Sequence, residues 1–340
     1  MVKIMHCGRS FIRNCTVISS AVFMFAAGVA PTLSMAQETA SNDWHCASEI
    51  VTDCDMPDGF ARLLFPDGRK KALVVSCDDG RIYDRKVVEI LNKHGMRGTF
   101  NLVSNWLDKD GYLTRAEIVQ LFAGHEVACH TVSHRSLTTL TDEQVRDEIA
   151  NNRTDLEHVA GHPVRGLAYP SGDVDDRVAG LMPALGLTYA RCVGVNHWFK
   201  LPSNPYLWIT TCNFCKNWMD DATVFLARTS GPSLMLVWGH SFDFAEDKSN
   251  YFTHDDKWNQ LEDFCNKVGG HDDIWYTTCI EVMDYVNAAK SMQISASGNF
   301  IKNPGTIPIW LEINGRMVEV KAGETVTIDV SRSKAKTAHR

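Results

Sequence analysis

The chain has 340 residues, of which 44% are hydrophobic, and a formal net charge of −7 at pH 7. This composition can fill the core of one large domain or of two ordinary ones, and it excludes general disorder. The excess of acidic over basic residues argues against nucleic acid or an anionic membrane surface as a partner, so a neutral or weakly charged substrate fits better.

Residues 1–36 are predicted to form an export signal. They carry three basic residues and no acidic one, and an apolar stretch runs from about Cys15 to Ala30. Small residues, Ser34 and Ala36, precede a plausible cleavage point after Ala36. Cleavage would leave 31 basic and 41 acidic residues, a net charge of −10. We expect an exported protein, periplasmic or secreted, with no stable membrane span after signal removal; an N-terminal anchor is the alternative.

Nine cysteines would remain after cleavage, an odd number. In an oxidising compartment a few could pair, for example Cys46 with Cys54 or Cys212 with Cys215, but the sequence does not determine the connectivity. The Cys-x-x-Cys spacing at 212–215 has no second copy, which argues against a structural metal site there.

Residues 37–71 are polar and turn-rich, and they are predicted to be a lead-in segment that includes one strand or hairpin. From Leu73 onward, short apolar strands alternate with amphipathic helices. The strands are predicted at 72–76, 97–103, 126–130, 165–170, 188–194, 233–240 and 272–278. The helices are predicted at 84–95, 114–125, 141–162, 176–186, 221–230 and 280–291.

This alternation predicts a mostly parallel α/β fold. About seven strand–helix units within about 220 residues favour a barrel over an open sheet, and in a barrel the site lies at the carboxyl ends of the strands. Residues 296–330 instead show alternating strands around an Asn-Gly turn, which predicts a small antiparallel β appendage.

Polar side chains fall at the ends of the predicted strands. Asp78 and Asp79 follow the first strand, His130 and His134 follow the third, and His240 ends the strand at 233–240. These residues are therefore expected to meet at one rim of the barrel.

The two histidines in "HTVSH" are four residues apart and would share a face if they lay on a helical turn. Two imidazoles and one carboxylate suit a catalytic divalent metal. The histidine pair and the aspartate pair are each weak signals alone. The histidines could be surface or core residues without a ligand, and Asp78 and Asp79 could cap the following helix. Together they predict hydrolysis of an amide or ester, with one carboxylate as base and His240 as acid.

In these motifs the chain resembles the polysaccharide deacetylases (NodB homology, carbohydrate esterase family 4). "SCDDG" is similar to the first family motif, usually TFDDG, and "GHEVACHTVSH" to the second. "LAYPSG" is similar to the third motif, "LVWGH" to the fifth, and "HGMRGTFNLV" to the usual second strand. The resemblance covers about residues 72–290.

The resemblance implies a distorted (β/α)7 barrel over residues 72–292. It also implies that Asp78 is the base, that Asp79, His130 and His134 bind one divalent metal, and that His240 is the acid. Zinc suits such a ligand set best, while cobalt, nickel and manganese also fit.

The third motif departs from the family pattern, which is commonly Arg-Pro-Pro-Tyr. Ala168 takes the place of the arginine that orients the base, and Ser171 takes the place of the tyrosine. Arg165 is a candidate substitute for the arginine, and the Ser171 backbone N–H could polarise the substrate carbonyl. The candidates for substrate or oxyanion binding are Tyr169, Pro170, Ser171, Arg165 and Trp238.

The fourth motif is not recognisable. Trp198, Tyr206 and Trp208 occupy its region and could stack on sugar rings or simply pack in the core. Asp243 follows His240 closely and could orient it.

We therefore expect an exported metal-dependent hydrolase that removes acetyl groups from N- or O-acetylated sugars of a glycan. The alternatives are a C–N hydrolase of the same superfamily that acts on a non-glycan amide or imide, and a non-catalytic glycan-binding barrel. The sequence does not identify the sugar, the native metal or the oligomeric state.

Overall fold

The computed structural model describes residues 44–46, 61–215, 218–245 and 257–328. The predicted export signal and its cleavage point lie outside the described residues, as does Cys54. The described residues belong to one compact unit, Asn42–Arg340. Among the described residues, no helix combines the length and apolarity needed to cross a membrane.

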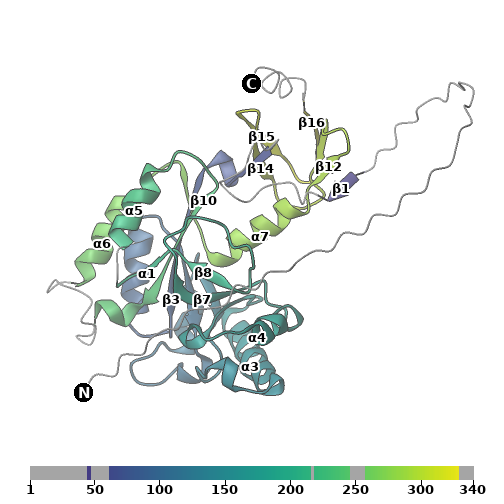
Figure 1. Cartoon of the computed structure of the whole chain (residues 1–340). Coiled ribbons are helices and arrows are strands. Elements are labelled where there is room, and N and C mark those ends of the chain that lie inside the picture. The colour runs from purple at the N-terminus through teal and green to yellow at the C-terminus, as the bar shows by residue number, and fades with distance from the viewer. Residues whose placement is uncertain (1–43, 47–60, 216–217, 246–256, 329–340) are drawn as a thin grey trace, which may run out of the picture. The chain divides into compact units, whose positions relative to one another are not determined.

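A mostly parallel sheet forms the centre of this unit (Figure 1). Its strand order is β8-β7-β6-β5-β4-β3-β10-β9, and β11 pairs with the first part of β3. The strands are β3 (Lys71–Asp78), β4 (Gly98–Leu102), β5 (Glu126–Cys129), β6 (Gly166–Ala168), β7 (Tyr189–Val195), β8 (Trp208–Thr210), β9 (Cys212–Asn213), β10 (Ser233–His240) and β11 (Ile274–Tyr276).

The two ends of this strand order are neighbours in the chain, because only Thr211 separates β8 from β9. The backbone N–H of Thr211 donates to the carbonyl of Leu236 at 2.9 Å, and that of Leu234 donates to the carbonyl of Phe199 at 2.8 Å. The sheet is therefore nearly closed into a barrel, which confirms the predicted fold class. Strands β8 and β9 were not predicted, since three and two residues are too few to show a period-two pattern.

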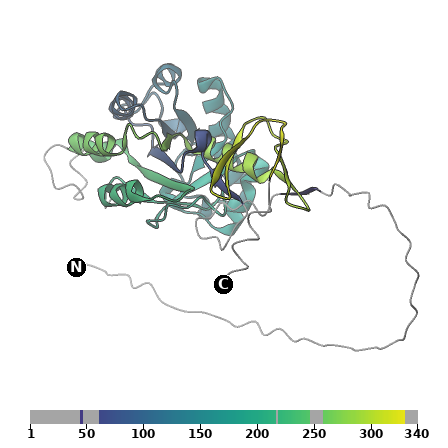
Figure 2. The same cartoon turned by 90° about the horizontal axis from the view of Figure 1, so that it is seen from above.

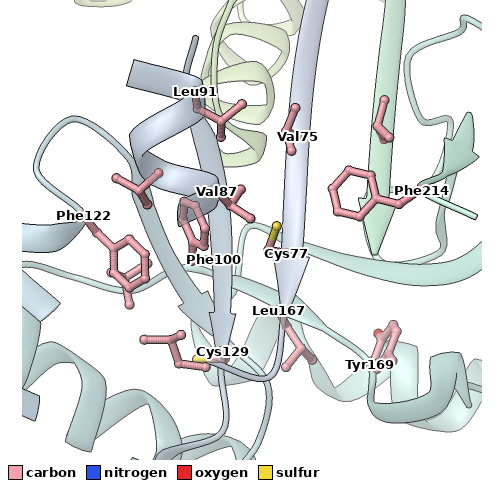
Figure 3. Close-up of a cluster of buried hydrophobic side chains, with 14 of the residues drawn as sticks. Val75, Cys77, Val87, Leu91, Phe100, Phe122, Cys129, Leu167, Tyr169 and Phe214 are labelled. Atoms are coloured by element: carbon pink, nitrogen blue, oxygen red, sulfur yellow. The ribbon is translucent and has the colours of Figure 1, made fainter. Parts of the chain in front are cut away.

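Helices alternate with the strands and cover the outside of the barrel (Figures 1 and 2). Their apolar faces meet the outward side chains of the strands in one large cluster, where Val87 and Leu91 lie near Val75 and Phe100 (Figure 3). The helices are α1 (Asp84–Lys93), α2 (Ile118–Leu121), α3 (Asp142–Ala160), α4 (Asp176–Leu181), α5 (Trp218–Ala227) and α6 (Lys257–Val268). Helix α6 was not predicted from the sequence.

Helix α7 (Cys279–Lys290) begins at the amino-terminal end of the barrel. The N–H of Ile280 donates to the buried Glu126 carboxylate at 2.9 Å, and that carboxylate also accepts from the hydroxyls of Thr99 and Tyr189, each at 2.8 Å. A second apolar cluster joins α7 to the inward side chains of β3 and β10, so the helix closes the end of the barrel opposite the predicted site.

Two small antiparallel sheets complete the unit. One has the order β15-β14-β2 and the other β1-β12-β13-β16. The strands are β1 (Trp44–Cys46), β2 (Ala61–Leu64), β12 (Gln293–Ser295), β13 (Phe300–Lys302), β14 (Ile309–Ile313), β15 (Arg316–Val320) and β16 (Thr325–Thr327). The predicted Asn-Gly hairpin is confirmed, since Asn314 and Gly315 join β14 to β15 with φ of 50° and 73°. Strand β2, from the predicted lead-in segment, pairs with β14.

Candidate active site

Asp78 is the last residue of β3, and its side chain points into the barrel, where it is 1% exposed. Its Oδ1 accepts hydrogen bonds from the Arg191 guanidinium and, at 2.9 Å, from the Asn101 side-chain amide. Both contacts are to Oδ1, so they fix the orientation of the carboxylate and leave Oδ2 outside these two hydrogen bonds. This is an arrangement suited to a general base.

Arg191 on β7 is the arginine that holds Asp78. It is fully buried, its Nη1 donates to the carbonyl of Cys192 at 3.3 Å, and its guanidinium lies 5.3 Å from the centre of the Trp238 ring. The sequence left open whether Arg165 or no residue takes this role. Arg165 does not take it, because it pairs with Asp284 on α7 at 2.7 and 2.8 Å.

The metal-ligand candidates converge as predicted. Ligand atoms of Asp79, His130 and His134 all lie within 4.8 Å of one another. Asp79 Oδ1 is 3.5 Å from His130 Nε2 and 3.6 Å from His134 Nε2. This buried oxygen has no hydrogen-bond partner among the described residues, which is unusual for a carboxylate.

The tautomer of His130 also suits a metal. Its Nδ1 lies 2.7 Å from the carbonyl oxygen of Ala168, which can only accept, so Nδ1 carries the proton and Nε2 is left as the ligand atom. The orphaned oxygen of Asp79 and this lone pair face the same space. The donor set of two imidazoles and one carboxylate therefore fits a divalent ion with open positions.

The two histidines do not lie on a helical turn, the condition under which their spacing alone would place them on one face. Residues 130–136 form an irregular segment after β5, in which Thr131 and His134 have φ of 67° and 60°. The N–H of His134 donates to the hydroxyl of Thr131 at 3.0 Å. Asp79 has φ of 82°, so two of the three candidate ligands occupy strained left-handed backbone, as is common at functional sites.

His240 ends β10 directly beside Asp78, with which it is in register. It therefore lies on the strand next to that of Asp78. Asp243 accepts from the His240 backbone N–H at 2.9 Å and lies 3.5 Å from its Nδ1. Burial lowers the pKa of His240, but Asp243, Asp78 and Asp79 outweigh it, so the net pKa is raised. A raised pKa keeps the ring protonated, as a general acid requires.

The charges of the site also act on Asp79 and His134. Burial raises the pKa of Asp79, but the interactions with the neighbouring histidines, His130 foremost, outweigh it and lower the pKa overall, which keeps the carboxylate ionised. Burial and the neighbouring His130 lower the pKa of His134, which keeps its ring neutral. Metal ligands need these two protonation states.

The remaining substrate-binding candidates take different positions. Tyr169 is fully buried, and its hydroxyl donates to the carbonyl of Tyr206 at 3.0 Å, so its side chain faces away from the site. Pro170 is also buried, whereas Ser171 is exposed just after β6 with φ of 57°. Trp238 lies between the Arg191 guanidinium and the His240 ring, and its buried Nε1 has no partner among the described residues.

Three aromatic residues were candidates for sugar stacking, and only one is strongly exposed. Trp198 is 64% exposed, whereas Trp208 is 2% exposed and packs against Tyr189. Tyr206 donates its hydroxyl to the carbonyl of Leu187 at 3.1 Å. Cys212 is a buried free thiol, so the suggested pairing with Cys215 is not formed.

Sequence reasoning missed Asn101, Arg191 and Trp106. Trp106 stacks on His134 with ring centres 5.0 Å apart. Asn101 and Arg191 could have been noticed as polar residues inside apolar strands, since a buried strand position rarely holds an arginine unless it is paired.

Part of the chain is similar to known polysaccharide deacetylases. The polysaccharide deacetylase family matches residues 66–190. Chitin deacetylase 1 of Cryptococcus neoformans var. grubii is 31% identical over 34% of this chain and 24% of its own length. A chitin deacetylase of Amylomyces rouxii is 38% identical over 42% of this chain and 30% of its own length. A peptidoglycan-N-acetylglucosamine deacetylase of Bacillus cereus is 23% identical over 36% of this chain and 56% of its own length. The matches thus span about a quarter to a half of these relatives.

Solved structures of the same kind are similar at a low level. A polysaccharide deacetylase from Bacillus cereus is 20% identical, with a TM-score of 0.36 over 51% of this chain and 49% of that one. A carbohydrate esterase family 4 domain of a multidomain xylanase, from a Trinervitermes trinervoides hindgut metagenome, is 14% identical. Its TM-score is 0.42, over 67% of this chain and 95% of that domain.

Proposed function

We propose that this protein, which matches the polysaccharide deacetylase family over residues 66–190, is an exported metal-dependent hydrolase. It would remove acetyl groups from N- or O-acetylated sugars of a glycan. The family match supports a hydrolase acting on acetylated sugars. The metal dependence, the residue roles and the export are our proposal. The observation that carries it is the convergence of Asp79, His130 and His134 beside an Asp78 held by Arg191 and beside His240.

In this proposal Asp79, His130 and His134 hold one divalent ion, most suitably zinc. When bound, the ion would act as a Lewis acid and lower the pKa of water at the site. Asp78 accepts the proton of the attacking water, and the Arg191 and Asn101 contacts keep its carboxylate oriented for that transfer.

The proton that the leaving group needs comes from His240. This residue is in register with Asp78, so base and acid stand on neighbouring strands at the same level of the barrel. Asp243 stabilises the protonated ring. Loss of the sugar amine or hydroxyl then completes hydrolysis, and acetate is released.

The test is acetate release from N-acetylated chitin oligosaccharides and from O-acetylated xylan, with and without a chelator. We expect release that stops on chelation and returns when zinc is added back. His130→Ala should lose both the bound metal, measured by elemental analysis, and the activity. His162→Ala is the matched control and should keep both, because this histidine is exposed and its ring lies against the carbonyl of its own neighbour Pro163.

A non-glycan amide substrate is the alternative that this panel tests. Ring opening of cyclic imides without acetate release from any glycan would refute the deacetylase proposal. Full metal content and full activity in His130→Ala would refute the metal site.

A further inference from the structure

A carboxylate from helix α3 holds the segment that carries two of the metal-ligand candidates. Glu148 is 9% exposed, and one of its carboxylate oxygens accepts from the backbone N–H of Ser133 at 2.9 Å. The other oxygen accepts from the Ser133 hydroxyl. The Glu148 backbone carbonyl also accepts from the N–H of Val132 at 3.1 Å. Glu148 thus contacts the two residues that lie midway between His130 and His134.

Asn152, one helical turn later on α3, holds the start of the same segment. It is fully buried, and its Oδ1 accepts from the backbone N–H of His130 at 3.2 Å. Its side-chain amide donates to the carbonyl of Leu102 at 3.1 Å. Residues four apart share a face of a helix, so Glu148 and Asn152 form one polar stripe against the segment. We call these two residues the α3 clasp.

The clasp lies where the backbone of the segment is least favourable. Thr131 and His134 have φ of 67° and 60°. Non-glycine residues persist in left-handed backbone only where their surroundings fix it. Val132 and Ser133 join these two residues, and both donate to Glu148. The contacts of Glu148 therefore hold the strained part of the segment in place.

A second loop of the site depends on the same segment. The N–H of Asn105 donates to the carbonyl of Val132 at 3.0 Å, and the next residue, Trp106, stacks on His134. A displacement of Val132 would therefore also disturb the ring that packs against His134.

The carboxylate of Glu148 is suited to this task. A glutamate is seldom buried unless its oxygens have partners, and here both oxygens take the two donors of Ser133. Hydrogen bonds to an ionised carboxylate are stronger than those between neutral groups, and two of them to one residue fix its orientation.

We propose that Glu148 is a positioning residue of the metal site, which holds Ser133 so that His130 and His134 are arranged for the ion before it binds. The inference rests on the proposed function and adds to it a residue that is not itself a ligand. Residues that support metal ligands from outside the ligand set typically change metal affinity by about 10-fold to 100-fold when they are replaced.

The test is the zinc affinity of the full protein, measured by competition with a chromophoric chelator. Glu148→Ala should bind zinc about 10-fold to 100-fold more weakly. Glu148→Gln keeps one acceptor oxygen for the Ser133 N–H and should retain part of the affinity. Glu143→Ala is the matched control, because this glutamate is exposed on the same helix, and it should keep the full affinity.

The visible absorption of the cobalt-loaded protein separates positioning from a general loss of stability. It reports the coordination geometry, so it should change in Glu148→Ala and stay the same in Glu143→Ala. Thermal melts show whether each variant is folded.

Ser133→Ala provides a second variant at the same contact. Its side chain is only partly buried, and loss of the hydroxyl should weaken zinc binding by a smaller factor than Glu148→Ala does. The double variant should bind zinc no more weakly than Glu148→Ala alone, because both changes remove the same contact. If Glu148→Ala does not fold, Ser133→Ala decides the question.

Unchanged zinc affinity or an unchanged cobalt spectrum in folded Glu148→Ala would overturn the inference. So would unchanged zinc affinity in Ser133→Ala, or losses that simply add in the double variant. Zinc binding that needs His130 but not Glu148 would refute the inference and leave the proposed function standing. Zinc binding that depends on Glu148, with no acetate released from any glycan, would refute the deacetylase and leave the positioning role standing.

Discussion

Replacement of Arg191 tests the assignment of the base most directly. Arg191 and Asp78 are each 1% exposed and share a charge-assisted contact. Arg191→Met removes the cation and leaves the Asp78 carboxylate buried, with the Asn101 amide as its remaining hydrogen-bond partner among the described residues. Breaking a buried ion pair in this way costs about 3 to 5 kcal/mol of unfolding free energy.

The double variant distinguishes a charge effect from a packing effect. Asp78→Asn alone leaves a buried guanidinium unpaired and should cost a similar amount, whereas Asp78→Asn combined with Arg191→Met removes both charges. We therefore expect the double variant to be no less stable than either single variant, with a coupling free energy of about 3 kcal/mol. Activity of Arg191→Met should fall about 100-fold, because a base that is misplaced by about 1 Å loses that much.

Urea unfolding of the four proteins measures the coupling, and acetate release measures the activity. Arg165→Met is the control, because Arg165 and Asp284 are 38% and 42% exposed and such a surface pair contributes about 0 to 1 kcal/mol. Additive losses, with a coupling free energy below about 0.5 kcal/mol, would refute the ion pair as the support of the base. A larger activity loss in Arg165→Met than in Arg191→Met would return the role to Arg165.

Three further variants test other parts of the unit. Burial raises the pKa of Glu126 to about 7, so the folded state holds its proton more tightly than the unfolded state does. The unfolding free energy should then fall by up to about 3 kcal/mol as the pH rises from about 4.5 to about 7. Glu126→Gln should remove this fall in urea titrations. The same pH dependence of the unfolding free energy in the variant and the unaltered protein would contradict it. A Cβ on Gly239 would lie 2.2 Å from a ring carbon of Phe214, so Gly239→Ala should lose about 1 to 3 kcal/mol and lower the activity, whereas Gly180→Ala meets no atom within 4 Å and should lose neither. Gly315→Ala, at φ of 73°, should destabilise the hairpin by about 1 kcal/mol in thermal melts, and an unchanged melting temperature would show that this turn relaxes.

Local patterns in the sequence were enough to predict the strand–helix alternation, the parallel barrel and the Asn-Gly hairpin. The same holds for the placement of Asp79, His130, His134 and His240 at the carboxyl ends of strands. These features depend on side chains that are close in sequence, and parallel strands bring their carboxyl ends to one rim whatever the details of packing.

The tertiary structure alone decided which residues support the base. Arg191 lies 113 positions from Asp78 in the chain and Asn101 lies 23 positions away, and the distances between them depend on how far the sheet curls before it closes. The left-handed backbone at Thr131 and His134 likewise follows from the packing around the site rather than from their spacing. The four-residue spacing of His130 and His134 could not reveal this backbone conformation, because several backbone paths bring two residues four apart to one metal position.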